Sequence, residues 1–119
     1  MASPAYNKAK GAKFETDIVK SLRELGFDAE RLHLNGKDDE GDIVLRDGGI
    51  FTVIEAKSGK MLPADFVRQA RVETENFRRN RDLDHAKVNG IVVVKRKGVT
   101  DILEQYVLTT VGDYFGLRR

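Results

Sequence analysis

The fold is decided by residues 41–57, which read GDIVLRDGGIFTVIEAK. Both halves of this stretch are rich in apolar and β-branched residues, which favour strands. Between them lies Asp47-Gly48-Gly49, a sequence typical of a tight hairpin turn because glycine accepts the positive φ that such turns need. The stretch therefore predicts two adjacent antiparallel strands, residues 41–46 and 50–57.

Three charged residues stand near the open end of this hairpin. Side chains alternate along a strand, so Glu55 and Lys57 point to the same face, and the turn folds Asp42 back opposite them. Two carboxylates brought together attract a hard cation, and Mg²⁺ typically binds through one or two carboxylates plus water and phosphate. A lysine alongside can orient a water or stabilise developing charge. The alternative is a pair of edge-strand charges that deters aggregation, since an isolated E-x-K is common.

Outward from the hairpin, periodicity predicts the remaining elements. Phe14, Ile18, Leu22 and Leu25 recur at helical spacing, which predicts a helix over residues 7–25 that stops at Gly26. The pattern further predicts strands at 28–34, 90–95 and 106–111, a helix from Pro63 to about Asp82, and a short helix from about Asp113. We therefore expect an α/β fold, a mixed central sheet flanked by helices, in a single domain over residues 1–119 with residues 1–6 as a flexible lead.

Composition excludes several classes of protein. The 119 residues contain no cysteine, which excludes disulfides and thiolate metal sites, and only two distant histidines, which disfavours a multi-histidine zinc site. No apolar run approaches membrane-spanning length, so we expect a soluble, cytoplasmic protein. The net charge of +2 does not itself predict nucleic-acid binding, but the basic residues are clustered, which suits phosphate contacts.

Four segments together resemble the motifs of the PD-(D/E)xK nuclease superfamily. They read KGAKFE at 10–15, LGF at 25–27, GDI at 41–43 and IEAKS at 54–58. Their order and spacing over residues 8–95 are most similar to the archaeal-type Holliday junction resolvases (Hjc) and their phage-encoded relatives. The resemblance implies a restriction-endonuclease-like fold and phosphodiester hydrolysis with Mg²⁺, for which Mn²⁺ can substitute. In two departures, Gly41 replaces the superfamily's proline, and residues 35–41 replace a Gly/Ser-rich loop with a lysine and three acids.

The resemblance also implies roles for individual residues. Asp42 and Glu55 would ligate the metal together with the Ala56 carbonyl, and Lys57 would act on the attacking water or the transition state. Glu15 would complete the catalytic set from the first helix and is a further candidate metal ligand. The alternative for Glu15 is an ordinary solvated helix glutamate. Gln69 falls where related nucleases often place a supporting glutamine.

Basic residues near these positions are candidate contacts to the DNA backbone, which position DNA without reading its sequence. They are Lys8, Lys10, Lys13, Arg31, Lys37, Arg68 and Arg71. For the arginines of the long helix, the alternative is surface pairing with Glu73 and Glu75 at short range.

The expected function is a junction-resolving endonuclease acting on four-way or branched DNA. Such junctions have two-fold symmetry, so a homodimer with two active sites would match them. The apolar residues between 106 and 117 offer a dimer surface, although they could instead close the monomer core. The alternatives are another PD-(D/E)xK nuclease of repair or restriction type, or a non-catalytic DNA-binding module.

Overall fold

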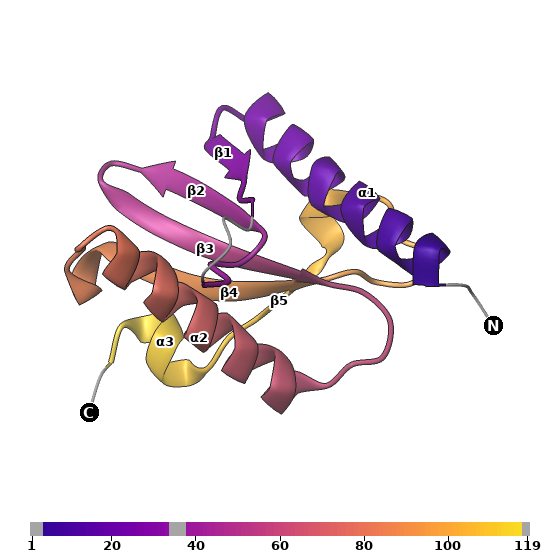
Figure 1. The fold of residues 1–119 in the computed structure, drawn as a ribbon. Helices are drawn as coiled ribbons and strands as arrows, with labels where there is room; N and C mark the ends of the chain where they lie inside the picture. The colour runs from indigo at the N-terminus through magenta and orange to yellow at the C-terminus, as the bar shows by residue number, and fades with distance from the viewer. Residues whose placement is uncertain (1–3, 34–37, 118–119) are drawn as a thin grey trace.

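A five-stranded mixed sheet with helices on both faces forms the framework of the computed structural model, which describes residues 4–33 and 38–117 (Figure 1). The helices are α1 (Pro4–Glu24), α2 (Pro63–Asn80) and α3 (Val111–Phe115), with short 3₁₀ turns at His85–Lys87 and Ile102–Glu104. The strands are β1 (Asp28–Arg31), β2 (Ile43–Asp47), β3 (Ile50–Lys57), β4 (Val88–Val94) and β5 (Tyr106–Leu108). They lie side by side in chain order; β3 and β4 are parallel and the other pairs antiparallel. The predicted α/β class with a mixed sheet is confirmed.

The β2–β3 hairpin closes through a two-residue turn, as its sequence predicts. Asp47 pairs with Ile50, and the intervening Gly48 and Gly49 have φ values of 57° and 83°. Two successive positive φ values are the signature of the turn that matches the natural twist of a hairpin. The resulting register pairs Ile43 with Ile54, which places Asp42 just beyond β2 and beside Glu55.

Each face of the sheet is covered by one long helix. On the first face, Phe14, Ile18 and Val19 of α1 pack against Ile43, Ile54 and Val93. On the second face, Phe66, Ala70 and Phe77 of α2 pack against Val44, Val53, Val88, Val92 and Val94. Because strand side chains alternate, Glu55 and Lys57 point to the same side as Val53, toward α2. The charged pair at the end of β3 therefore lies beneath that helix.

Several predicted boundaries need correction. Helix α1 already begins at Pro4, so residues 4–6 are helical rather than a loose lead, while residues 1–3 fall outside the described chain. Leu25 is 53% exposed and does not continue the apolar stripe, because the helix ends at Glu24 and Gly26 turns the chain with φ 93°. Strand β1 ends at Arg31, although the Leu32 amide still donates to the Asp42 carbonyl at 2.8 Å.

Across residues 4–33 and 38–117, no helix combines the length and the apolar character that crossing a bilayer requires.

Candidate active site

Asp42 is held against the neighbouring strand by its backbone and its side chain. Its amide donates to the Ile54 carbonyl at 3.1 Å, and its Oδ2 accepts a 2.8 Å hydrogen bond from the Ala56 amide. Both contacts continue the β2–β3 pairing by one residue before Ile43, where β2 begins. They fix the Asp42 carboxylate beside Glu55, as the hairpin predicted.

Glu55 and Lys57 are joined by a residue of α2. The Nε2 of Gln69 donates to Glu55 Oε2 at 2.5 Å, and its Oε1 accepts from Lys57 Nζ at 2.7 Å. Lys57 Nζ also lies 3.6 Å from Glu55 Oε2 and 5.6 Å from the centre of the Phe66 ring. The amide of Gln69 thus matches a donor to the carboxylate and an acceptor to the ammonium.

Glu73 is a member of the cluster that the sequence did not predict. Surface pairing with the helix arginines was the alternative weighed for those arginines, and it does not hold for this residue, which is only 2% exposed. Its Oε1 accepts a 2.8 Å bond from Gln69 Nε2, while its buried Oε2 has no hydrogen-bond partner. The signal was present, because Glu73 lies three residues after Ala70 and four before Phe77, inside the apolar stripe of α2.

Pairing of the predicted kind does occur one step along the same helix. Glu75 accepts from the guanidinium of Arg78, with a shortest distance of 2.5 Å. These hydrogen bonds lower the pKa of Glu75. Helix-surface pairing therefore describes Glu75 but not Glu73.

Glu15 approaches the cluster from the opposite face of the sheet. Its carboxylate accepts from Arg31 Nη2 at 3.4 Å. Burial raises its pKa, and the charge of Asp42 raises it further, against the opposing effect of Arg31. Two carboxylates that influence each other in this way lie close together, so Glu15 is a half-buried neighbour of Asp42 rather than a freely solvated helix residue.

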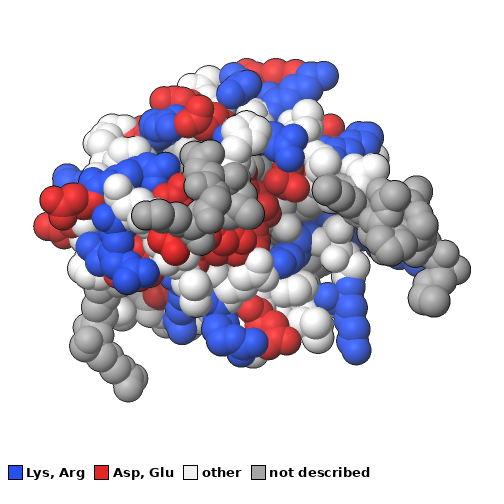
Figure 2. Space-filling model, viewed as in Figure 1, with Lys and Arg blue, Asp and Glu red and all other residues white. Residues whose placement is uncertain are grey.

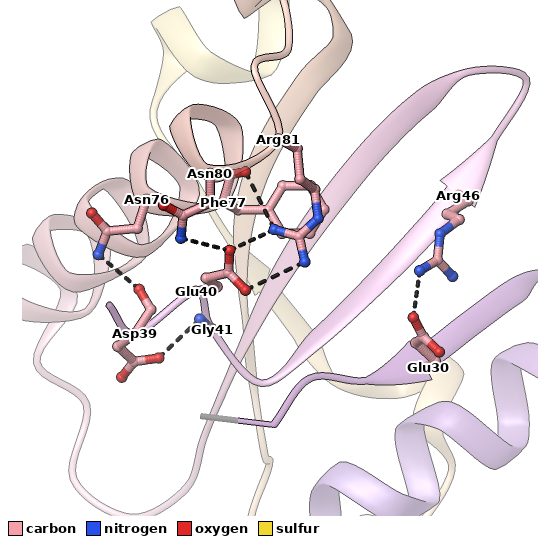
Figure 3. A network of polar contacts seen from close by, with 9 residues as sticks. All are labelled: Glu30, Asp39, Glu40, Gly41, Arg46, Asn76, Phe77, Asn80 and Arg81. Carbon is pink, nitrogen blue, oxygen red and sulfur yellow. Dashed lines mark hydrogen bonds and ion pairs between the residues drawn. The ribbon is translucent and has the colours of Figure 1, made fainter. Parts of the chain in front are cut away.

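The acids that precede Asp42 anchor their loop to the end of α2 (Figure 3). Glu40 accepts hydrogen bonds from Arg81 and Asn80, and the Arg81 guanidinium lies 3.8 Å from the centre of the Phe77 ring. Asn76 donates to the Asp39 carbonyl, and the Asp39 side chain accepts from the Gly41 amide at 2.9 Å. The part of the acidic loop that is described therefore acts as a bracket for Asp42.

The buried carboxylates oppose one another electrostatically. Burial raises the pKa of Glu55 to about 11, and contacts with Asp42 and Glu73 act in the same direction. Burial likewise raises the pKa of Glu73. A site with this much unbalanced negative charge favours a proton or a cation.

The donor set fits a hard divalent ion that needs few protein ligands. Among the described residues, no group of three or more His, Cys, Asp or Glu side chains is arranged to hold an ion. Mg²⁺ commonly takes one or two carboxylates and completes its shell with water and phosphate. Asp42, just before β2, and Glu55 on β3 supply two neighbouring carboxylates, and Glu73 Oε2 is a buried acceptor without a hydrogen-bond donor. A ligand role for the Ala56 carbonyl stays a prediction.

The predicted DNA contacts are dispersed along the chain. Lys10 and Lys13 are exposed on α1, where Lys13 pairs with Asp17 at 2.8 Å, and Arg31 lies beside Glu15. Arg68 pairs with Asp65, whereas Arg71 contacts Asp113 and Thr110 next to α3 and not the Glu55 cluster. Lys37 lies outside the described residues, and the position of the Lys8 side chain is not described. On the face shown in Figure 2, acidic side chains gather near the middle with basic ones around them.

Together, a mixed sheet with α1 and α2 on its faces and two acids and a lysine at the end of its central hairpin define a nuclease of the restriction-endonuclease-like class. The family model described as archaeal Holliday junction resolvase (Hjc) matches residues 6–75, which is more than half of the chain. The chain therefore belongs to the archaeal Hjc family, whose members are metal-dependent crossover junction endonucleases.

A solved structure supports the same assignment. The 1.6 Å structure of Archaeoglobus fulgidus Hjc, described as a Holliday junction resolvase from an archaeal hyperthermophile, superimposes with a TM-score of 0.55 at 25% sequence identity. The match covers 83% of this chain and 71% of that one. A comparison with curated proteins finds no match. The expected link to phage-encoded proteins has no support in these comparisons.

Proposed function

We propose that the chain is a Mg²⁺-dependent endonuclease that cleaves four-way DNA junctions, with Asp42, Glu55 and Lys57 at the scissile phosphate. The observation that carries the proposal is the hydrogen-bonded cluster of Asp42, Glu55, Gln69 and Lys57, which lies inside the segment that the family model matches. The A. fulgidus relative is itself described as a Holliday junction resolvase.

The chain's own residues would divide the chemistry between them. Asp42 and Glu55 would hold the ion, which when bound supplies Lewis-acid polarisation of the phosphate and a lower pKa for nearby water. Lys57, kept beside Glu55 by the Gln69 carbonyl, would donate to the attacking water or to the phosphate oxygen that gains charge. Glu15, the neighbour of Asp42, would act from the α1 side as a further ligand or as an acceptor for the water's proton.

Backbone phosphates would be held by basic residues on both sides of the cluster. Lys10 and Lys13 on α1 and Arg31 on β1 lie on the Glu15 side, and Arg68 lies next to Gln69 on α2. Such contacts position DNA without reading its sequence, which suits an enzyme that recognises junction shape. Lys8, Lys37 and Arg71 complete the proposed set of DNA contacts. Arg71 has the least support, because it is paired with Asp113 in α3.

A homodimer would match the two-fold symmetry of a junction. Of the C-terminal apolar residues, Leu108 packs against the core cluster beneath α2. Val111, Tyr114, Phe115 and Leu117 are between 67% and 73% exposed. Tyr106 and Val107 on the neighbouring edge strand β5 are also more than half exposed. An apolar surface next to an open strand edge is a suitable place for a second copy. A function on DNA junctions would also place the protein in the cytoplasm.

Cleavage of a synthetic four-way junction tests the proposal. With Mg²⁺ or Mn²⁺, the wild-type protein should introduce paired symmetric nicks, and Glu55→Gln and Lys57→Met should lose them. Glu30→Gln is a matched control, because Glu30 is a carboxylate on β1 paired with Arg46 and makes no contact with the cluster. Linear duplex, flap and single-stranded DNA of the same sequence should be cut more slowly.

The same panel separates the alternatives. A preference for flap or duplex DNA over the junction would favour another nuclease of this superfamily. Junction binding without cleavage at any metal concentration would favour a non-catalytic module. Either result would overturn the proposed activity.

A further inference from the structure

Gln69 is the one described side chain that contacts Glu55, Lys57 and Glu73 together. Its Nε2 donates to Glu55 at 2.5 Å and to Glu73 at 2.8 Å, and its Oε1 accepts from Lys57 at 2.7 Å. A terminal amide carries two donor hydrogens, so both donors of Gln69 are used. Glu73 lies one helical turn after Gln69, which is the spacing at which helix side chains meet.

The orientation of this amide decides whether the cluster holds together. Rotation by 180° would turn the Gln69 carbonyl toward the Glu55 carboxylate and the amino group toward the Lys57 ammonium, and both new contacts would be repulsive. In the proposed reaction Glu55 engages the ion and Lys57 engages the water or phosphate. Their hold on Gln69 would weaken at that moment, whereas the bond from Gln69 to the buried Glu73 needs neither the ion nor the substrate.

Glu73 is also a poor choice for stability alone. It is 2% exposed in an apolar stripe, and its Oε2 has no hydrogen-bond partner. A buried polar atom without a partner costs free energy, and an apolar residue of similar volume would fill the space better. A destabilising residue that contacts the active-site cluster calls for a functional reason.

We propose that Glu73 is a positioning residue of the nuclease: its carboxylate fixes the Gln69 amide, which in turn keeps Glu55 and Lys57 correctly placed throughout turnover. The inference rests on the proposed function, which it deepens by adding a residue that acts through another. It assigns Glu73 no contact with DNA and no contact with the metal.

Three variants test the inference. Glu73→Met removes the acceptor and keeps the volume, and Glu73→Gln keeps a carbonyl acceptor. Glu75→Gln is a matched control two residues along α2, where the carboxylate accepts hydrogen bonds from Arg78. Glu73→Met should raise the melting temperature and lower kcat about tenfold with little change in KM, the effect of losing one charge-assisted hydrogen bond. Glu73→Gln should restore most of kcat, and Glu75→Gln should leave it unchanged.

Two further readouts identify the route through Gln69. In ¹⁵N-labelled protein, the Gln69 side-chain amide protons should resonate downfield and exchange slowly, and Glu73→Met should reverse both properties in the metal-free state. In a double-mutant cycle, adding Glu73→Met to Gln69→Met should cause no further loss of kcat, since coupled residues are not additive. These amide signals need no catalysis, so they judge the positioning role even if no junction is cut.

Several outcomes would overturn the inference. Unchanged Gln69 amide signals in a folded Glu73→Met protein would show that Glu73 does not fix the amide. Additive losses in the cycle would show that Glu73 acts independently of Gln69. Should Glu73→Met fail to fold, rapid exchange of the Gln69 amide protons in the wild-type protein would by itself contradict the proposed contact.

Discussion

The Ala56 amide donates a 2.8 Å hydrogen bond to Asp42 Oδ2, so the strand that carries Glu55 also holds the acid opposite it. Asp42 lies just before β2, which begins at Ile43, and its backbone is held by hydrogen bonds to Ile54 and from Leu32. The direction of its carboxylate in the proposed metal site depends in addition on this bond between a side chain and the backbone of the neighbouring strand. Replacements of Asp42 that keep an acceptor for the Ala56 amide should therefore affect stability less than replacements that remove it.

Replacing Asp42 by asparagine should separate chemistry from folding. Asn retains an oxygen acceptor for the Ala56 amide, so the melting temperature of the metal-free protein should change little. Junction cleavage should fall by at least about 100-fold, the upper end of the loss seen when only an outer-shell partner of a metal is removed. Asp42→Leu should in addition lose about 1–3 kcal/mol of stability, because it leaves that amide without a partner. Cleavage by Asp42→Asn at the wild-type rate would contradict the assigned role.

Stability should depend on pH through Glu55. Burial and the contacts with Asp42 and Glu73 raise the pKa of Glu55 to about 11, from an ordinary value of 4.5. Between these values the folded chain retains a proton that the unfolded chain releases, so the metal-free protein should lose stability as pH rises above about 5. Glu55→Gln should flatten this slope and, at pH 8, melt at least about 4 °C higher, which corresponds to about 1 kcal/mol at this size. Thermal melts across the pH range in EDTA measure it.

Two comparisons sharpen the pH experiment. Mg²⁺ should stabilise the wild-type protein but not Glu55→Gln, since only a ligand that binds the folded state raises its stability. Glu30→Gln should keep the wild-type slope above pH 6, because hydrogen bonds from Arg46 lower the pKa of Glu30 and its titration lies in the acid range. A wild-type stability that increases as pH rises above about 5 would contradict the expected protonation of Glu55.

Gly41 should tolerate a side chain less well than another glycine of the same hairpin. Its φ is 96°, and an added Cβ would lie 2.8 Å from Val53 Cγ1 and 3.3 Å from Glu73 Oε2. Gly49 has a similar φ of 83° but nothing within 4 Å of an added Cβ. We expect Gly49→Ala to cost about 1 kcal/mol from strain, and Gly41→Ala to cost about 3 kcal/mol from strain plus overpacking. Equal costs in urea unfolding would remove the packing argument.

The same glycine explains a departure from the superfamily motif. Proline holds φ at about −65°, whereas this loop requires φ 96° before Asp42. The superfamily's proline therefore does not fit the backbone of this chain. The bracket formed by Glu40 and Arg81 positions Asp42 by another route.

The C-terminal apolar surface should control assembly. If two copies associate through α3 and β5, Tyr114→Lys combined with Phe115→Lys should shift the particle toward the monomer mass of 13.4 kDa in sedimentation experiments. Leu103→Lys changes a residue of comparable exposure outside α3 and β5 and should leave the mass unchanged. In the Tyr114→Lys and Phe115→Lys double variant, the two nicks in a junction should no longer be made as a pair. A monomeric wild-type protein that still makes paired nicks would exclude this dimer.

Local sequence signals were sufficient for the fold and for three members of the cluster, Asp42, Glu55 and Lys57. The glycine turn fixed the hairpin, and alternation along β3 placed Glu55 and Lys57 on one face, as the structure confirms. Strand ends were less predictable, because they depend on pairing with distant residues. Strand β5, for example, stops at Leu108 and not at residue 111, where the chain instead turns into α3.

The position of Glu73 in the apolar stripe of α2 indicates burial, although charged residues on a helix usually face solvent. Only the packing of α2 over β3 shows that this carboxylate lies beside Glu55 and is bound to Gln69. The anchoring of the acidic loop was hidden for a related reason: Glu40 and Arg81 are 41 residues apart, and nothing local links them. Long-range polar contacts of this kind leave no periodic trace in a sequence.

The bracket of Glu40 and Arg81 changes the electrostatic surface that an approaching nucleic acid would meet. Burial alone would raise the pKa of Glu40, but hydrogen bonds from Arg81 and Asn80 lower it, so the acid stays ionised and its charge is neutralised within the protein. The guanidinium is in turn covered on one side by the Phe77 ring. The repulsion between the acidic loop and a phosphate backbone is thus reduced within the protein itself. The negative charge that stays unbalanced is that of the cluster around Asp42 and Glu55, where a cation would bind.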